Sequence, residues 1–314
     1  MNKKITVIGA AIIDIMAGAI DKELFNRGSV PAERMEMTFG GDGLNEAVVL
    51  SNLGMDCELV TLLGKDETAD TILKYLKENG VSVSKVTRSG DIVTGINIVL
   101  VDEAGERYFV TNPNGSLRKL SKESILPYVA DMGDIVSFAS IFVSPMLTVS
   151  DMEEVFGAIK ETGRILVADM TTAKNSEKIT DIQPILKYID FIIPNEFEAA
   201  VLTGERDPVK NAGILMDHGA KCVIIKCGKN GCVYANEKGI YSIPAFPAKA
   251  IDTTGAGDGF VAGFIYGLAN EMPIRECCRY GNATASVIVE HMGTQCIKGA
   301  AGEVNRRYQY GKGR

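Results

Sequence analysis

The sequence contains no tryptophan, only two histidines and no pair of cysteines in a C-x-x-C spacing. Neither His218 nor His291 stands at ligand spacing from a cysteine pair, which argues against a zinc site. The seven cysteines are odd in number, so we expect free thiols and no disulfide framework. Free thiols suit a reducing compartment, and the cytoplasm is the location that we expect.

Long apolar runs and an excess of positive charge are also absent. No run of about 20 apolar residues occurs, so the sequence predicts no transmembrane helix and no membrane partner. The 33 Lys and Arg residues against 40 Asp and Glu residues give a net charge of −7, which argues against a nucleic-acid partner. Backbone amides can still bind a small anionic ligand without net positive charge.

Strand and helix patterns alternate along most of the 314 residues. Residues 5–10 form a continuous run that is rich in β-branched residues, as expected for a strand buried on both faces, and residues 44–53 have the apolar spacing of a helix. This alternation predicts an α/β fold with an open, mostly parallel sheet and helices on both faces. Residues 15–39, without a convincing helix, and 93–111 instead predict antiparallel strands of a small additional sheet.

The strongest motif, D-T-T-G-A-G-D-G-F, spans residues 252–260 and leads directly into an apolar helix. Gly255, Ala256 and Gly257 carry almost no side chain, so their N–H groups at the helix N-terminus can form an anion site. Asp258 follows in the first helical turn. A carboxylate there can accept a proton from a substrate hydroxyl while the amides hold a transferring phosphoryl group. The plain alternative is a glycine-rich turn whose Asp complements the helix dipole.

Residues 252–258 resemble, without a mismatch, the signature of the ribokinase/PfkB family of carbohydrate kinases. The F-G-G-D-G-L-N sequence at residues 39–45 is similar to the Gly-Gly motif that this family carries near its N-terminus. A Walker A P-loop and a G-x-G-x-x-G after the first strand are absent, as they are from this family. The resemblance implies one ribokinase-like kinase domain over residues 1–314, with a small β lid contributed by about 15–39 and 93–111.

The resemblance implies a catalytic role for the motif at residues 252–258. Asp258 is similar to the family's catalytic base, which deprotonates the acceptor hydroxyl and so also touches the substrate. The amides of Gly255, Ala256 and Gly257 are similar to the anion hole for the γ-phosphate. ATP and Mg²⁺ are the cofactors that this implies.

Five further residues are implied to bind the acceptor. The two oxygens of Asp14, just after the first strand, suit a vicinal diol. Gly40 and Gly41 let backbone approach the substrate, and Asn45 can hydrogen-bond a hydroxyl. Asp42 departs from the Lys, Ala or Ser more usual at its position. A carboxylate there favours a neutral or cationic substrate and disfavours a phosphorylated one.

The nucleotide and metal sites are implied in the second half of the chain. Asn195 and Glu198 resemble the N-x-x-E pair that organises Mg²⁺ largely through water. Lys226 or Lys229 can meet a phosphate, and Asp252 resembles part of a monovalent-cation site that takes K⁺. The residues implied to bind the nucleotide are Asn195, Lys226, Gly228, Gly231 and Asn282.

The resemblance therefore predicts an ATP-dependent kinase for a small non-phosphorylated sugar, fructose- or ribose-like. Residues 137–147 lack the carboxylate that some ribokinases have there, which weakens the case for ribose. A nucleoside kinase is the nearest alternative, and Phe109, Phe138 or Phe142 could stack on a base. A non-catalytic sugar-sensing protein on the same fold is the other. The lid could pair two chains in a homodimer or fold over the site of its own chain.

Overall fold

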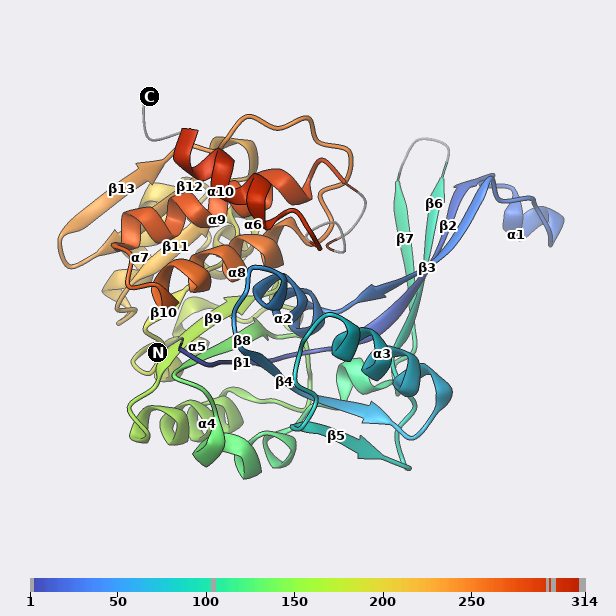
Figure 1. The fold of residues 1–314 in the computed structure, drawn as a ribbon, viewed down its shortest axis with the longest axis horizontal. Helices are drawn as coiled ribbons and strands as arrows, with labels where there is room; N and C mark the ends of the chain where they lie inside the picture. Colours follow the sequence, from blue (N-terminus) through green and yellow to red (C-terminus); the bar gives the residue numbers. More distant parts are fainter. Residues whose placement is uncertain (1–2, 103–105, 292–293, 295–297, 311–314) are drawn as a thin grey trace.

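The computed structural model describes residues 3–102, 106–291, 294 and 298–310, and a nine-stranded sheet forms its centre (Figure 1). The strands in their order across the sheet are β13 (Gly239–Ile243), β12 (Cys232–Asn236), β11 (Val223–Lys226), β10 (Phe191–Ile192), β9 (Ile165–Met170), β8 (Ile135–Ile141), β1 (Ile5–Ile8), β4 (Cys57–Gly64) and β5 (Val86–Ser89). Neighbours from β11 to β5 pair in parallel, while β12 and β13 form an antiparallel hairpin at one edge. The predicted open, mostly parallel sheet is confirmed.

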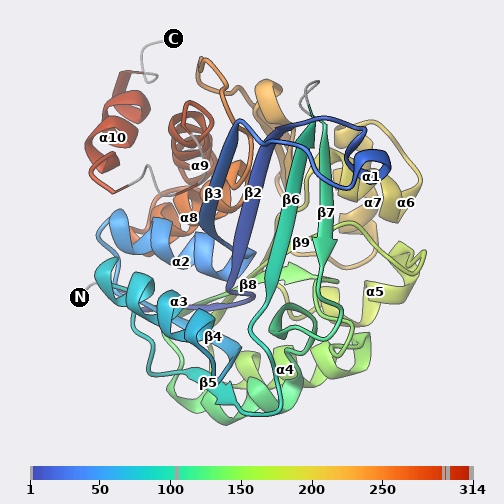
Figure 2. The ribbon, with the colours of Figure 1, turned by 90° about the vertical axis from the view of Figure 1, so that its right-hand side faces the viewer.

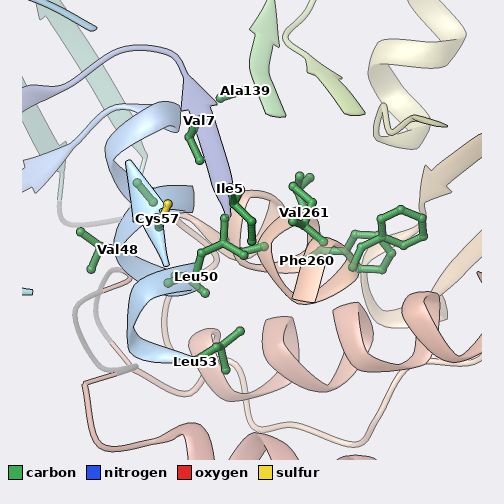
Figure 3. Close-up of a cluster of buried hydrophobic side chains, with 14 of the residues drawn as sticks. Ile5, Val7, Val48, Leu50, Leu53, Cys57, Ala139, Phe260 and Val261 are labelled. Atoms are coloured by element: carbon green, nitrogen blue, oxygen red, sulfur yellow. The ribbon is translucent and has the colours of Figure 1, made fainter. Parts of the chain in front are cut away.

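Helices cover both faces of this sheet, and each face has its own apolar core. One face carries α2 (Asp42–Asn52), α3 (Glu67–Glu78), α8 (Ala256–Ala269), α9 (Ile274–Ile288) and α10 (Ala301–Tyr310). The other carries α4 (Val149–Glu161), α5 (Ile179–Leu186), α6 (Glu196–Thr203), α7 (Pro208–Asp217) and the 3-10 turn η3 (Leu126–Asp131). Two shorter 3-10 turns, η1 (Ser116–Arg118) and η2 (Lys122–Ser124), precede η3, and a third, η4 (Gly228–Asn230), joins β11 to β12. Figure 3 shows part of the first core, where Ile5 of β1, Leu50 of α2 and Val261 of α8 lie together. Among the described residues, no helix has the length and apolarity needed to span a membrane.

A second, four-stranded sheet projects from one side of the body (Figures 1 and 2). We call it the lid, and its strands in order are β3 (Arg34–Gly40), β2 (Ile12–Ile20), β6 (Ile96–Asp102) and β7 (Arg107–Thr111). The predicted additional sheet is therefore present, and it begins three residues earlier than predicted, at Ile12, so that Asp14 lies inside a lid strand.

Two details of the lid prediction were wrong. The hairpins β2–β3 and β6–β7 are antiparallel, but β2 and β6 pair in parallel. Each of these two strands is the outgoing arm of its hairpin, so they leave the body side by side in one direction. The tip of the first hairpin also forms a single helical turn, α1 (Leu24–Arg27), which ends at Gly28 with a φ of 74°.

Close backbone packing brings the two glycine-containing motifs together. A Cβ on Gly43, at the start of α2, would lie 2.6 Å from the backbone carbon of Gly9, just after β1. The absence of side chains lets the N-terminus of α2 sit directly on the end of β1. From this position Asn45 of α2 reaches Asp258 at the N-terminus of α8.

Candidate active site

A cavity of about 910 Å³ opens at the carboxyl ends of the parallel strands. This edge is where open α/β sheets bind ligands. Ile12 and Asn97 of the lid contribute to its wall, and Ala256, Gly257 and Asp258 of α8 contribute from the body. Many of the residues predicted to bind substrate and nucleotide line it together: Asp42, Asn195, Glu198, Lys226, Lys229, Gly228, Gly231 and Asn282.

The N-terminus of α8 is where the sequence predicts an anion site. Gly255 is the residue before the helix and has a left-handed backbone with a φ of 73°. A side chain there would also collide with the methyl group of Thr294, so glycine is required. Ala256 donates its N–H to the carbonyl of Thr253 at 3.2 Å, whereas the structure records no backbone acceptor for Gly257 N–H within the described chain. The N–H groups of Gly255 and Asp258 likewise have no recorded backbone acceptor there, so the start of α8 offers several amides, Gly257 among them, to an anion.

Asp258 is held by a two-step hydrogen-bond chain. Asn45 donates from Nδ2 to Asp258 Oδ2 at 2.7 Å, and Thr294 donates from its hydroxyl to Asn45 Oδ1 at 2.9 Å. The Thr294 bond fixes which end of the amide faces the carboxylate. Burial raises the pKa of Asp258 to about 7, with the charges of Asp42 and Asp169 adding to the shift while Asn45 opposes it. A carboxyl with this pKa suits a general base near neutral pH.

Lys226 lies at the end of β11 and forms a buried ion pair with Asp169 of β9. A Cβ on Gly257 would be 3.5 Å from Lys226 Nζ, so the ammonium lies beside the anion site of α8. Burial lowers the pKa of Lys226, but the charges of Asp169 and Glu198 outweigh it and the net shift is upward. The group therefore carries a positive charge where a transferring phosphoryl group would be held.

Asn195 and Glu198 form a capping box at the start of α6. Glu198 N–H donates to Asn195 Oδ1 at 2.8 Å, and Asn195 N–H donates to Glu198 Oε2 at 2.7 Å. Burial raises the pKa of Glu198 to about 7, and the charges of Asp169 and Asp258 add to this while Lys226 opposes it. These repulsions would be relieved by a divalent cation in the cavity.

The described part of the chain contains no cluster of three or more His, Cys, Asp or Glu side chains that could hold a metal ion directly. Mg²⁺ prefers oxygen donors and keeps several of its waters when it is bound by a protein. The carboxylates of Asp169, Glu198 and Asp258 line one cavity, so they could reach such an ion through water.

Where the lid meets α2, Asn97 and Asp42 line the cavity, and Asp14 lies beside Asn97 without being one of the lining residues. Asn97 of β6 donates from Nδ2 to Asp14 Oδ1 at 3.0 Å across the lid, and burial raises the pKa of Asp14. A side chain on Gly40 would collide with the Asp14 carboxylate, so this glycine makes room for it. Asp42 Oδ1 accepts from the N–H groups of Ala10, at 2.8 Å, and Gly43, at 2.7 Å, and burial raises its pKa to about 6.

A model of the pfkB family carbohydrate kinases matches residues 2–298 of the chain. The chain belongs to this family. It is similar to the ribokinase of Haemophilus influenzae, with 28% identity over 303 residues that cover 94% of this chain and 95% of the relative. It is also 28% identical to the bifunctional ribokinase/ribose-5-phosphate isomerase A of Fructilactobacillus sanfranciscensis, over 93% of this chain, but it spans only 54% of that protein. The solved structure of Thermotoga maritima ribokinase has a TM-score of 0.82 and 26% identity, covering 98% of this chain and 99% of that one.

Membership of the pfkB family confirms the resemblance inferred from the two motifs, and the neighbouring structures confirm the ribokinase-like fold with its lid. The chain is accordingly a carbohydrate kinase, a phosphotransferase whose acceptor is a hydroxyl group. The roles of individual residues are not given by these comparisons and depend on the geometry above.

Three residues of this pfkB kinase that were predicted to bind the nucleotide or a cation make structural contacts in the fold. Asn282 donates from Nδ2 to the carbonyl of Pro244 at 3.1 Å and so tethers the segment that leads into the cavity wall. Asp252 is 4% exposed and accepts from the N–H and the hydroxyl of Thr254, at 3.0 and 2.8 Å. Gly231, with a φ of 91°, packs against the backbone of Ile243 and shapes the turn after β11.

Asp169 and Asn97 are site residues that the sequence analysis missed. The apolar run at residues 165–168 has the pattern of a buried strand and leads directly to Asp169, and a carboxylate at the carboxyl end of a parallel strand lies at the ligand edge. That signal could have identified Asp169. Asn97 occupies an alternating lid strand, and only the pairing of β2 with β6 places it opposite Asp14.

Proposed function

We propose that this kinase transfers the γ-phosphoryl group of ATP to a hydroxyl of a small non-phosphorylated sugar, fructose- or ribose-like. The observation that carries the proposal is the position of Asp258. This carboxyl, with a pKa of about 7, adjoins the N-terminus of α8 and faces the same cavity as the lid. An acceptor held beneath the lid would therefore present a hydroxyl to Asp258, while the amide of Gly257 faces the phosphoryl group.

In the proposed reaction, residues at the lid bind the sugar, and residues at the N-terminus of α8 act on the attacking hydroxyl and the phosphoryl group. Asp14, steadied by Asn97, accepts hydrogen bonds from a pair of sugar hydroxyls at the lid. Asp258 takes the proton of the attacking hydroxyl. Gly257 N–H and the Lys226 ammonium hold the phosphoryl oxygens in line with it. Closure of the lid would exclude water, which suppresses wasteful ATP hydrolysis.

We further propose that Mg²⁺ accompanies ATP and that K⁺ binds near Asp252. Asn195, Glu198 and Asp169 would organise Mg²⁺ through water, and the ion would neutralise charge on the phosphates. Asp252 would contribute to the K⁺ site from the loop before α8, with carbonyl oxygens of the loop as further ligands.

A sugar is favoured over a nucleoside by the surroundings of the candidate aromatic platforms. Phe138 is 3% exposed and packs edge-on against Phe156, with ring centroids 5.0 Å apart, so it belongs to the core. Phe142 packs against the same core. The side chain of Phe109 lies outside the described part of the chain. Of the three candidates, Phe138 and Phe142 are thus engaged in core packing and not free to stack on a nucleoside base.

The experiment that tests this function is Mg-ATP consumption against a panel of free sugars, nucleosides and sugar phosphates. We expect turnover with at least one free sugar and little with nucleosides or sugar phosphates. A nucleoside preferred by more than tenfold would replace the proposal with a nucleoside kinase. Sugar binding measured by calorimetry without any ATP turnover would contradict the kinase assignment for this chain.

We also propose that two chains pair through the lid. On the lid face opposite Asp14 and Asn97, apolar side chains of neighbouring strands lie side by side according to the strand register. Several of them are exposed: Met35, Met37, Ile98, Tyr108 and Val110, by 42–70%. An apolar patch of this kind marks an interface, and a second lid has the matching surface.

The pairing predicts a dimer in sedimentation experiments at micromolar concentration. Met37→Glu combined with Val110→Glu should raise the dimer dissociation constant at least about 100-fold, because two charges would be buried in an apolar interface. Ile240→Glu, on the exposed edge strand β13, is the matched control and should leave the dimer intact. A wild-type protein that is monomeric at these concentrations would rule out pairing of two chains through the lid.

The whole chain is proposed to act as one kinase domain in the cytoplasm. Both glycine motifs and the lid contribute residues to one cavity, which supports a single kinase domain. Six described cysteines are buried free thiols, which suits a reducing compartment.

A further inference from the structure

Residues 244–250, which lead from β13 towards α8, have no regular secondary structure. We call them the wall segment, because residues 245–248 and 250 line the cavity. Ser286 and Val289, at the end of α9, line it as well, and α9 packs beside β12 and β13. The lid projects from the opposite side of the molecule (Figure 1). An acceptor beneath the lid therefore leaves this end of the cavity to the nucleoside of ATP.

The wall segment has few polar contacts to hold it in place. Within the described chain, the one hydrogen bond recorded for residues 245–250 runs from Lys249 N–H to Glu290 Oε1, at 2.9 Å. Directly after the segment, Ile251 N–H donates to the carbonyl of Val289 at 2.7 Å. A backbone segment with a single anchor keeps its position only while that anchor holds. The carboxylate of Glu290 therefore fixes this wall of the cavity.

Glu290 follows α9 and is held in turn by α10. Arg307 donates from Nη2 to Glu290 Oε2 at 2.5 Å and from Nη1 to the carbonyl of Ser286 at 2.8 Å. Its Nε donates to Glu303, one turn earlier in α10, at 2.8 Å. The Arg307 guanidinium and then the N–H of Lys249 hold the pKa of Glu290 below its usual range, so the carboxylate is ionised and accepts both bonds.

One guanidinium thus reaches two parts of the cavity wall. It binds Ser286 of α9 directly, and it binds the wall segment through Glu290. Neither Glu290 nor Arg307 is among the residues that line the cavity, so contact with a ligand is left to the residues that they hold. Their side chains are 28% and 18% exposed, which leaves this ion pair less screened by solvent than a pair on the open surface.

We propose that Glu290 and Arg307 are positioning residues for ATP, which set the space between the wall segment and α9 that receives its nucleoside. This inference rests on the proposed kinase function and extends its machinery to α10. The lining residues here are mostly alanine, with Phe246, Pro247 and Val289 among them, so they offer shape and few polar contacts. Affinity for the nucleoside then depends on close fit between the two parts of the wall, and a small displacement weakens it.

The test measures KM for ATP at saturating acceptor, and KM for the acceptor at saturating ATP. Glu290→Ala should raise KM for ATP about 10- to 100-fold, and Arg307→Met about tenfold, as the loss of a hydrogen bond to a charged group would. The double variant should exceed Glu290→Ala by less than about threefold, because Arg307 acts mainly through Glu290. In each variant, kcat and KM for the acceptor should change less than about twofold, because the contacts at Asp258 and the lid remain.

Trypsin provides a readout that does not depend on turnover. Lys249 is exposed and its own N–H carries the anchor, so release of the wall segment should open the bond between Lys249 and Ala250 to cleavage. Cleavage there should be at least about fivefold faster in Glu290→Ala and Arg307→Met than in the wild type. Arg306→Met is the matched control, since it removes the neighbouring arginine of α10, whose side chain is 64% exposed. It should change neither the kinetics nor the cleavage.

The outcomes separate this inference from the proposed function. KM for ATP within about twofold of wild type in both variants would overturn the inference and leave the kinase standing. Parallel losses in kcat and both KM values with a lower melting temperature would also overturn it, because they indicate general destabilisation. Should Glu290→Ala fail to fold, Arg307→Met carries the same comparison.

Absence of turnover on every acceptor would instead contradict the proposed function. In that case ATP binding measured by calorimetry decides the inference. An affinity lowered about tenfold or more by Glu290→Ala and by Arg307→Met supports the positioning role, and unchanged or absent binding overturns it.

Discussion

Asp258→Asn is expected to lower kcat by about 10³-fold, in the range that a positioned general base contributes. The asparagine keeps an oxygen that can accept the hydrogen bond from Asn45, which is 2.7 Å from the carboxylate in the native protein. It cannot accept the proton of the attacking hydroxyl. KM for ATP should change little, because the amide of Gly257 and the ammonium of Lys226 remain. Steady-state kinetics on the best acceptor would measure both effects.

The pH dependence gives this prediction a second readout. Asp258 has a pKa of about 7, so the carboxyl is mostly protonated below that value and mostly ionised above it. Only the ionised form can act as a base. We therefore expect kcat/KM to rise about tenfold per pH unit below 7 and to level off above it, and this limb should vanish in Asp258→Asn.

Glu237→Gln is the matched control, since it neutralises an exposed carboxylate in the turn between β12 and β13. It should change neither kcat nor the pH profile. Equal melting temperatures for wild type and Asp258→Asn would show that any loss is catalytic. An Asp258→Asn enzyme that retains more than about a tenth of wild-type kcat would mean that another group removes the proton.

The sequence was informative about the site wherever the chemistry is local. Residues 252–258 determine their own geometry, because a glycine turn at a helix N-terminus exposes amides whatever surrounds it. The capping pair Asn195 and Glu198 is local in the same sense. Asp42 was singled out from the sequence, but its two backbone donors, Ala10 and Gly43, were not foreseen, and the Ala10 contact depends on the packing of α2 against β1.

What the sequence did not reveal depends on contacts between distant segments. Asn45 was expected to bind a substrate hydroxyl, and the structure places its amide nitrogen on Asp258, with Thr294 orienting it. The parallel pairing of β2 with β6 could not be inferred from alternation, because alternation predicts a strand and not its neighbour. The short helix α1 was missed because one turn is too short for its periodicity to show.

The ion pair of Asp169 and Lys226 also joins distant segments, and breaking it gives the second large expected effect. Lys226→Met should lower kcat about 10²- to 10³-fold, as expected when one charge that stabilises the transferring phosphoryl group is removed. It should also destabilise the protein by about 3–5 kcal/mol, because Asp169 is 4% exposed and would lose its cation. Lys238→Met, in an exposed turn, is the control and should affect neither quantity.

A double-mutant cycle then distinguishes the roles of the two residues. If Asp169 acts by positioning Lys226, Asp169→Asn should lower kcat about 10- to 100-fold alone and add almost nothing to Lys226→Met. The double variant should also be more stable than Lys226→Met, since no buried carboxylate is left without its partner. Kinetic losses that multiply would instead mean that Asp169 contacts substrate or metal by itself. In that case Asp169 would belong among the metal-organising carboxylates with Glu198, and its substitution should raise the Mg²⁺ concentration needed for half-maximal activity.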